Sequence, residues 1–459
     1  MRSNARRTRR PTSAAVVLAV LLMLVLAACG SRLPESDFEQ PAPAPGTGGA
    51  PNANTASDVG VTPTEIKIGM IDTASGLLGG ETFSGPMYGA QAFFQALNAK
   101  GGINGRTITV VACDDEGAGF INQKCARRLI DDDKVFAFAG NSIYKYDGAE
   151  YVSSQGVPDV GGIPVGNAYD TYQHLYSLYG SGAPRNGEVG WNGTLYQNTA
   201  IYRYFKEKLG ARTAAVVSYN QADSARYAES IKDGLRAEGY TVVDKQVDFA
   251  LANFDAAVVD MRNRGVDIVF DAIDTRGNAL LCKAMDGAGL RVQAKVSTVQ
   301  SQNALVKSEF KDSPTCRNSI HVTGTSRSYE DVGHPAVAEF RDAMRTYFPD
   351  REDKMSQWTL EGWASAQWLV DAIASCGADV TRECVEAFVN RPEGYDAHGL
   401  LVPVDFRPLT AEEVRQPAKW CINAVRWQDS ANDGKGGWVD QVPDMDTNCF
   451  VVPSLPYKP

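Results

Sequence analysis

The chain has 459 residues, of which 44% are hydrophobic and 22% are charged, and its formal net charge is −10. This length and hydrophobic content exclude the disordered and fibrous classes and allow two compact lobes. The excess of acidic residues disfavours a polyanionic partner, so we expect no nucleic-acid binding.

The first 28 residues have the pattern of a secretory signal. Residues 1–10 carry five arginines and no acid, and residues 14–26 are almost wholly apolar. This combination is typical of an export signal, and the apolar run is shorter than the roughly 20 residues of a spanning helix. The sequence therefore predicts a lipoprotein signal peptide over 1–28 and no transmembrane helix in the mature chain.

The end of this signal contains a cysteine among small residues. Leu26-Ala27-Ala28-Cys29 resembles the bacterial lipobox, in which the cysteine is acylated and becomes the new N-terminus. The alternative is an ordinary cleavage site beside a chance cysteine. Residues 29–60 are rich in Pro, Gly and Ala, which is typical of a disordered tether. We expect Cys29 to anchor an extracytoplasmic protein to the cell membrane through its lipid.

Strands and helices alternate along the rest of the chain. The periodicity predicts strands at 65–72, 106–115, 135–142 and 157–162, separated by helices at 85–102, 117–133 and 146–156. A second series follows with a helix near 191–210, strands at 213–220, 240–248, 266–274 and 294–300, and helices at 224–239, 254–265 and 276–289. Segments at 174–186 and 318–331 interrupt the pattern. Helices at 334–348 and 355–377 and strands at 400–406 and 420–429 complete it.

This alternation predicts an α/β fold with two doubly wound, Rossmann-like lobes. If the late helices return to the first lobe and the last strands cross again, the lobes share a hinge of several segments. We assign 61–178 and 326–400 to lobe one, and 179–325 and 401–459 to lobe two.

Eight cysteines remain after Cys29, and they fall into four close sequential pairs. Disulfides are the expected state outside the cytoplasm. We predict Cys113 with Cys125, Cys282 with Cys316, Cys376 with Cys384, and Cys421 with Cys449. Zinc is the rival interpretation, but the chain has no CxxC and its four histidines lie far from these pairs in sequence.

Residues 65–76 and 89–117, above all 98–106 with the sequence NAKGGINGR, resemble the opening of type 1 periplasmic binding proteins of the Leu/Ile/Val-binding group. The resemblance covers roughly 65–450. It implies two Rossmann-like lobes joined by three crossover segments, a small-molecule ligand held in the cleft, and delivery to an ABC permease. It also explains Cys29, because a lipid anchor replaces free diffusion in Gram-positive relatives. We expect a monomer.

Loops at the carboxyl ends of strands supply ligand contacts in such folds. In lobe one these loops nominate Ser75, Phe83, Asn141, Ser142, Tyr144 and Gly162. The resemblance implies that Asn141 and Ser142 match the residues that offer a hydroxyl to a ligand carboxylate. At the loop that usually adds a Thr, this chain has 165–167, Val-Gly-Asn.

In lobe two the same rule nominates Asn220, Asp223, Asp274 and Gln300. The family's acid for a ligand ammonium aligns with Val299 or Gln300, which leaves Asp274, with Asp223, as the nearest substitute. The alternative interpretation of Asp274 is a helix N-cap. Tyr146 and Tyr219 could also line the cleft, or be ordinary packing residues. We expect the ligand to bind lobe one first and lobe two to close over it.

Motifs for catalysis are absent: the chain has no GxSxG, HExxH or Walker A sequence. Residues 429–440 place acids at EF-hand-like spacing, but Ala431 stands where a ligand belongs, which favours a hairpin turn. We expect no enzyme activity, no cofactor and no metal. The predicted function is a substrate-binding protein of an ABC importer for an amino acid or similar solute. The alternative is a sensor on the same fold that reports to a signalling partner, and a hydrolase ranks third.

Overall fold

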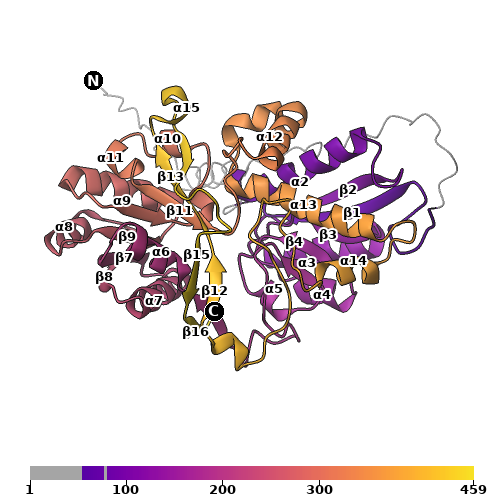
Figure 1. Cartoon of the computed structure of the whole chain (residues 1–459), viewed down its shortest axis with the longest axis horizontal. Helices are drawn as coiled ribbons and strands as arrows, with labels where there is room; N and C mark the ends of the chain where they lie inside the picture. Colours follow the sequence, from indigo (N-terminus) through magenta and orange to yellow (C-terminus); the bar gives the residue numbers. More distant parts are fainter. Residues whose placement is uncertain (1–53, 77–79) are drawn as a thin grey trace, which may run out of the picture.

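A computed structural model describes residues 54–76 and 80–459 of the chain (Figure 1). The predicted signal peptide, the lipobox with Cys29 and most of the predicted tether lie outside the described residues. The described residues form two α/β lobes that lie side by side, each built on its own sheet. This is the two-lobed architecture that the alternation of strands and helices predicts.

The sheet of lobe one is parallel, in the order β2-β1-β3-β4-β5. Its strands are β1 (Glu65–Asp72), β2 (Thr107–Asp114), β3 (Ala137–Ala139), β4 (Asp159–Gly162) and β5 (Leu175–Ser177). The last five residues of β1 are all buried. Such continuous burial is typical of a parallel strand that helices cover on both faces.

Helices from both ends of the chain cover this sheet. They are α2 (Glu81–Ala99), α3 (Gly119–Arg127) with η2 (Arg128–Asp132), α4 (Ala149–Ser154), α5 (Ala168–Thr171), α12 (Pro335–Tyr347) with η4 (Pro349–Lys354), α13 (Gln357–Ser375) and α14 (Arg382–Val389). In α2, a Cβ at Gly89 would lie 1.8 Å from the carbonyl oxygen of Thr359 in α13. Glycine therefore permits the close packing that holds the late helices on lobe one (Figure 1).

The sheet of lobe two has the order β14-β13-β11-β10-β9-β7-β8. Its parallel strands are β7 (Thr213–Tyr219), β8 (Thr241–Val247), β9 (Ile268–Ala272), β10 (Ala294–Ser297) and β11 (Ile320–Gly324), and antiparallel β13 (Asn423–Gln428) and β14 (Gly437–Asp440) extend one edge. Two small antiparallel pairs, β12 (Ala418–Cys421) with β15 (Cys449–Val452) and β6 (Leu195–Asn198) with β16 (Ser454–Tyr457), lie beside it.

The helical elements of lobe two are α6 (Ala200–Lys208), α7 (Ala222–Ala237), α8 (Asp255–Asn263), α9 (Thr275–Ala288), η3 (Val299–Ser301), α10 (Val306–Glu309), α11 (Pro314–Arg317), η5 (Glu413–Arg415) and α15 (Ala431–Gly434). In the part of the chain that the structure describes, no helix is both long enough and apolar enough to cross a membrane.

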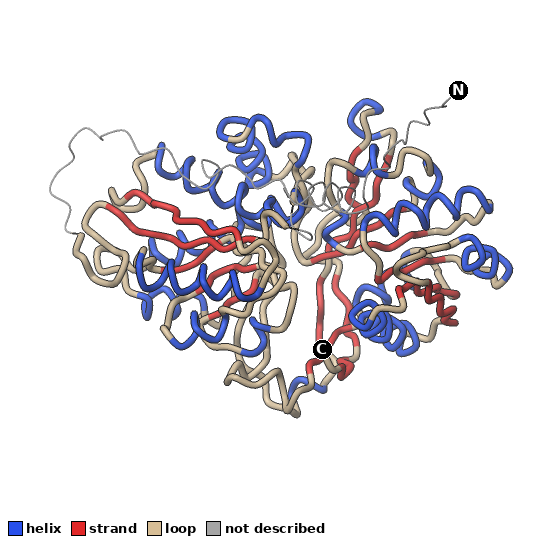
Figure 2. Tube along the Cα trace, turned by 180° about the vertical axis from the view of Figure 1, so that it is seen from behind, coloured by secondary structure: helices blue, strands red, loops and turns tan. Residues whose placement is uncertain are grey.

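The chain passes between the lobes after β5, after β11 and after α14. We call the connecting segments 178–186, 325–331 and 400–409 the hinge. The second and third segments are bonded to each other, with Arg327 N donating to Leu400 O at 2.7 Å. The first is bonded to the third, with Leu409 N donating to Gly182 O at 2.8 Å. Figure 2 shows these loops between the two sheets.

The structure corrects two expected elements. Strand β11 lies inside segment 318–331, which we expected to be a break, and it joins β10 to the antiparallel edge. Segment 400–406, expected as a strand, makes only isolated bridges from Leu401 and Val404, because it runs along the hinge and not along a sheet. The expected hairpin at 429–440 is confirmed, since β13 and β14 pair across it. The residue boundaries of the lobes stay a prediction.

The structure forms all four predicted disulfides. Cys113–Cys125 and Cys376–Cys384 lie in lobe one, and Cys282–Cys316 and Cys421–Cys449 lie in lobe two. Their sequence separations are 12, 8, 34 and 28 residues in that order. Each bridge therefore closes a loop within one lobe and leaves the hinge uncrosslinked.

Candidate functional site

The loops that follow β1, β3 and β4 meet at the carboxyl-terminal edge of the lobe-one sheet. Ser142, after β3, forms parallel bridges with Asp72 at the end of β1 and with Ile163 after β4. Carboxyl ends of parallel strands are the usual location of ligand contacts in open α/β sheets. This edge is therefore the first place to look for a binding site.

An apolar cluster covers this edge and reaches into lobe two. Phe83, Ile163 and Trp358 are buried in it, and Tyr144, Val165 and Val299 pack against them. The ring centroid of Phe83 lies 5.3 Å from that of Trp358 and 6.3 Å from that of Tyr144, and both ring pairs are edge to face. Val299 belongs to η3 of lobe two, so we call this group the interlobe cluster. It gives the junction an apolar, aromatic wall.

Hydrogen bonds join the lobes beside the interlobe cluster. Gln357 N, at the start of α13, donates to Gln302 O at 2.8 Å, and Ala304 N donates to Met355 O at 2.9 Å. These bonds attach the loop after β10 to the N-terminus of α13. Gln300, a predicted contact, lies in this loop and is half-buried.

Two polar side chains under this wall are fully buried without a partner for one of their atoms. Asp72 Oδ1 accepts from Ser142 N at 3.1 Å, but Asp72 Oδ2 and Ser142 Oγ have no hydrogen-bond partner among the described residues. Burial, with the nearby carboxylates of Asp115 and Asp114, raises the pKa of Asp72 well above its usual range. A ligand group or water that accepts a hydrogen bond from the protonated Asp72 would satisfy it.

Other acids at this edge are bonded within the protein, although Asp159 Oδ1 has no partner among the described residues. Ser75 donates to Asp114 through its hydroxyl. Asp159 Oδ2 accepts from Tyr146 at 2.8 Å and from Tyr169 at 2.9 Å. Burial raises the pKa of Asp159 to about 6, although these phenols lower it. Tyr146 therefore serves this buried network and not the interlobe cluster.

Asn141 and Gly162 support the sheet. Asn141 is fully buried, and its Oδ1 accepts from Ile71 N at 2.7 Å. Gly162 lies in β4, where a Cβ would be 1.7 Å from the hydroxyl oxygen of Tyr169. Asn141 Nδ2 is buried without a partner among the described residues, and a ligand role for Asn141 and Gly162 stays a prediction.

In lobe two, the predicted residues lie at the carboxyl ends of β7 and β9. Asp274 is the N-cap of α9, and its Oδ1 accepts from Gly277 N at 2.9 Å and from Tyr219 OH at 2.7 Å. Its Oδ2 has no hydrogen bond to any residue that the structure describes. The helix-cap interpretation is thus confirmed, while one carboxylate oxygen is left for a ligand.

The two other predicted residues of lobe two lie near Asp274. Asn220 donates to Asp248 Oδ2 at 3.0 Å and accepts from Phe249 N at 2.9 Å, which braces the loop after β8. Asp223 lies at the start of α7, and its side chain is not among those described. Their roles as ligand contacts stay predictions.

A buried ion pair lies beneath this edge of lobe two. Lys295 in β10 is fully buried and donates to Asp271, Asn278 and Ser297. Burial lowers the pKa of Lys295, and the Asp271 carboxylate partly offsets that. All three ammonium hydrogens are used, so this group stabilises the lobe and offers nothing to a ligand.

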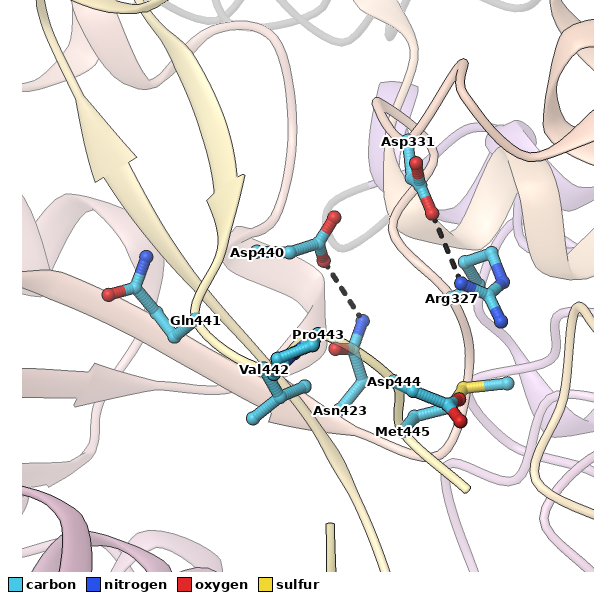
Figure 3. A pocket seen from close by; sticks show the side chains of 9 residues that line it. All are labelled: Arg327, Asp331, Asn423, Asp440, Gln441, Val442, Pro443, Asp444 and Met445. Carbon is cyan, nitrogen blue, oxygen red and sulfur yellow. Dashed lines mark hydrogen bonds and ion pairs between the residues drawn. The ribbon is translucent and has the colours of Figure 1, made fainter. Parts of the chain in front are cut away.

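A cavity of about 340 Å³ lies on the lobe-two side of the hinge (Figure 3). It is lined by Arg327, Asp331, Asn423, Asp440, Gln441, Val442, Pro443, Asp444 and Met445. Arg327 and Asp331 form an ion pair at 3.1 Å, and burial, with the Asp331 carboxylate nearby, raises the pKa of Asp440 to about 6. None of the predicted ligand contacts lines this cavity.

The described ranges contain no group of three or more His, Cys, Asp or Glu side chains that could hold a metal ion.

The structure thus brings Phe83, Ser142 and Tyr144 of lobe one together beside Gln300 of lobe two. The sequence reasoning missed Asp72, Ile163 and Trp358, and it named Val299 only as a position aligned with the family's acid, not as part of an apolar wall. An acid as the last residue of an apolar strand is a readable signal for Asp72. Trp358 lies between the capping-box residues Ser356 and Thr359, but nothing in the sequence shows that this helix start faces the other lobe.

Comparisons with known proteins agree with this architecture. Residues 65–433 match the family described as "Periplasmic binding protein". An "Amino acid binding protein" of Pseudomonas aeruginosa is 24% identical over 342 residues, which is 70% of this chain and 84% of that protein. A fatty acid ABC transporter substrate-binding protein from Thermomonospora curvata superposes with a TM-score of 0.63 at 16% identity, covering 86% of this chain and 97% of the other. A branched-chain amino acid transporter substrate-binding protein from Streptococcus pneumoniae, in complex with isoleucine, gives a TM-score of 0.58 at 18% identity, with coverages of 82% and 100%.

Proposed function

This chain belongs to the periplasmic binding protein family, and from that premise we propose that it is the lipid-anchored receptor of an ABC importer. It takes an amino acid or a similar small amphipathic solute between its lobes and has no enzymatic activity. The observation that carries the proposal is the interlobe cluster, in which Val299 of lobe two packs against Phe83 and Trp358 of lobe one. An apolar wall with a few polar groups is typical of small-molecule sites.

The polar groups beside this wall support an amphipathic ligand. On the lobe-one side, Ser142 Oγ and Asp72 Oδ2 are buried without a partner among the described residues, and such atoms are costly unless a ligand or water satisfies them. On the lobe-two side, the exposed Asp274 has one carboxylate oxygen that accepts no hydrogen bond from a described residue. The similar fatty acid ABC transporter substrate-binding protein and the similar protein in complex with isoleucine together cover apolar and zwitterionic solutes.

A thermal-shift screen tests the proposal directly. The mature protein is heated with a panel of amino acids, short fatty acids and aromatic acids, and a true ligand raises the Tm by mass action. Trp358→Ala should lose this shift, whereas Trp420→Ala, which changes an exposed tryptophan on β12, should keep it. A ligand that stabilises both variants equally would place the site elsewhere.

Asp274→Asn tests the amino-acid option. If Asp274 binds the ligand ammonium, the variant should weaken an amino acid by about 2 to 5 kcal/mol, the usual cost of removing one member of a buried charge pair. Calorimetry would measure this, and an unchanged affinity would leave Asp274 as a helix cap alone. If no amino acid binds the wild-type protein, an uncharged or anionic metabolite becomes the favoured ligand class.

Two further experiments address the anchor and the partner. Cys29→Ala should release the protein from membranes, while Ser36→Ala in the same segment should not. Membrane retention of Cys29→Ala would contradict the anchor. The alternative role, a sensor on the same fold, would be favoured if the ligand-bound protein fails to stimulate ATP hydrolysis by a permease complex encoded beside it.

A further inference from the structure

Glu361, in α13, is a buried carboxyl group that contacts two segments of the hinge. Its side chain is 1% exposed. Oε2 accepts from Tyr179 OH at 2.8 Å, and Oε1 accepts from Ser326 Oγ at 2.6 Å. Tyr179 belongs to the first hinge segment and Ser326 to the second, so one side chain of lobe one holds both.

The helix turn around Glu361 adds contacts with the same segments. Gln357, one turn earlier, donates to Ser326 Oγ at 2.9 Å and to Arg327 O at 2.7 Å. Trp358, three residues before Glu361 and so on the same side of α13, lies in the interlobe cluster. A change at Glu361 therefore acts on the hinge and on the wall of the proposed site together.

The charges around Glu361 leave it without a cation. Tyr179 is the titratable group bonded to it, and none of the described residues forms an ion pair with it. On the second hinge segment, Arg327 forms an ion pair with Asp331. Asn423 donates to Ser326 O and to Asp440, and so lies between Ser326 and the Asp440 carboxyl group. Groups on the other elements packed against α13 are bonded elsewhere: Tyr88 of α2 to Arg351, Asp159 of β4 to Tyr146 and Tyr169, Glu386 of α14 to His174, and Glu339 of α12 to Lys100.

Glu361 changes protonation state near neutral pH because it is buried without a cation. Burial raises the pKa of Glu361 to about 7, although the hydrogen bonds from Ser326 and Tyr179 lower the pKa. The ionised carboxylate accepts from both hydroxyl groups. Protonation turns one carboxyl oxygen into a donor and a weaker acceptor, so the hydrogen bond at that oxygen must reverse or weaken, and charge-assisted bonds become neutral ones.

We propose that Glu361 is a positioning residue for lobe movement, which clamps both hinge segments to α13 when ionised and loosens one of them when protonated. The inference rests on the proposed function, because it makes movement of the lobes, and hence closure on the solute, sensitive to pH. The pH-dependent movement is expected in the ligand-free protein.

Small-angle scattering of the ligand-free mature protein between about pH 5.5 and 8.5 tests the clamp. The radius of gyration should fall as pH rises through about 7, because the ionised clamp restricts the lobes. Glu361→Gln should stay at the acid value throughout, because an amide donates and accepts as the protonated acid does. Glu309→Gln is the control: the pKa of Glu309 is raised too, but its side chain is exposed on α10, outside the three hinge segments, and the transition should persist.

Tyr179→Phe provides a second variant should Glu361→Gln fail to fold. It removes one donor to the carboxylate, so the transition should move to higher pH and lose amplitude. A flat wild-type profile, or a Glu361→Gln profile identical to that of the wild type, would overturn the clamp. Either result would leave the proposed function standing if the thermal-shift screen still finds a ligand. A clear pH transition without any ligand would keep the clamp and overturn the receptor.

Discussion

Asp72 in lobe one and Asp271 in lobe two are both buried acids near the carboxyl end of a parallel strand, but their surroundings are opposite. Asp271 receives an ammonium hydrogen from Lys295, and Asn278 and Ser297 complete the group. Asp72 receives one backbone N–H and has other carboxyl groups, Asp114, Asp115 and Asp159, as its charged neighbours.

The difference shows how one architecture accommodates a buried carboxyl group in two ways. Lobe two keeps the charge and neutralises it with a buried cation, which requires that both partners be present. Lobe one favours the protonated state, so the stability of that lobe depends on pH. An unpaired oxygen under the interlobe cluster is also available to a ligand, whereas the closed network of Lys295 is not.

The largest expected effect comes from breaking the ion pair of lobe two. Lys295→Met leaves Asp271 buried without its cation, so the free energy of unfolding should fall by about 3 to 5 kcal/mol. Denaturant unfolding measures this. Arg236→Met, which breaks an exposed pair with Asp233, should change it by less than about 0.5 kcal/mol. Equal losses in both variants would mean that the buried pair adds nothing beyond a surface contact.

The next effect is the pH dependence that an unpaired acid produces. The pKa of Glu361 is about 7 in the folded protein against 4.5 for a free side chain. The folded state then holds the proton more tightly, so its contribution is complete below about pH 4.5 and is lost as pH rises to about 7. This amounts to about 3 kcal/mol. In Glu361→Gln, the fall in the free energy of unfolding between about pH 4.5 and 7 should be smaller by about 3 kcal/mol than in the wild type. An unchanged slope would contradict the raised pKa of Glu361.

Asp72→Asn should change the stability of the protein by a smaller amount, and in the opposite direction to Asp271→Asn in lobe two. An amide keeps the bond from Ser142 N and removes the cost of ionising a buried group, so the variant should be more stable than the wild type at about pH 8. Asp271→Asn should be less stable, because Lys295 loses its charged partner. Thermal unfolding at about pH 8 compares the two, and a destabilised Asp72→Asn would refute the contrast.

The smallest effect concerns two serines. Ser142 Oγ has no partner among the described residues, so Ser142→Ala should leave stability unchanged or raise it by up to about 1 kcal/mol. Ser297 Oγ accepts from Lys295 at 2.5 Å and donates to Asp271 at 3.1 Å, so Ser297→Ala should cost about 1 kcal/mol. Paired denaturation curves measure both. Similar losses would show that Ser142 has a partner in solution.

Much of the fold could be predicted because the parallel strands are long apolar runs between clear turn signals. Segment 65–72 is β1 with the same bounds, and 213–220 contains β7. Strand β11 was missed because His321 and Thr323 break its apolar run, although tertiary contacts bury both. Segment 400–406 is apolar for a different reason, since it belongs to the third hinge segment and Leu400, Leu401, Val404 and Phe406 are buried in the core there.

The candidate site was less predictable than the fold. Loop positions were readable from the strand ends, so Ser142 and Tyr144 could be placed at this edge, and their role as ligand contacts stays a prediction. Side-chain contacts were not readable, so the sequence did not show that Asn141 Oδ1 accepts from Ile71 N or that Tyr169 packs against Gly162. Trp358 and Val299 are 59 residues apart in sequence, and only the packing of α13 against the loop after β10 brings them together.

The short loops closed by the four disulfides bear on how the exported chain is oxidised. Each cysteine pairs with the next one along the described chain, at separations between 8 and 34 residues. A chain that emerges from the membrane N-terminus first presents the members of each pair one after the other. Sequential oxidation therefore gives the native connectivity at every step, and disulfide exchange catalysed by an isomerase is not needed to reach it.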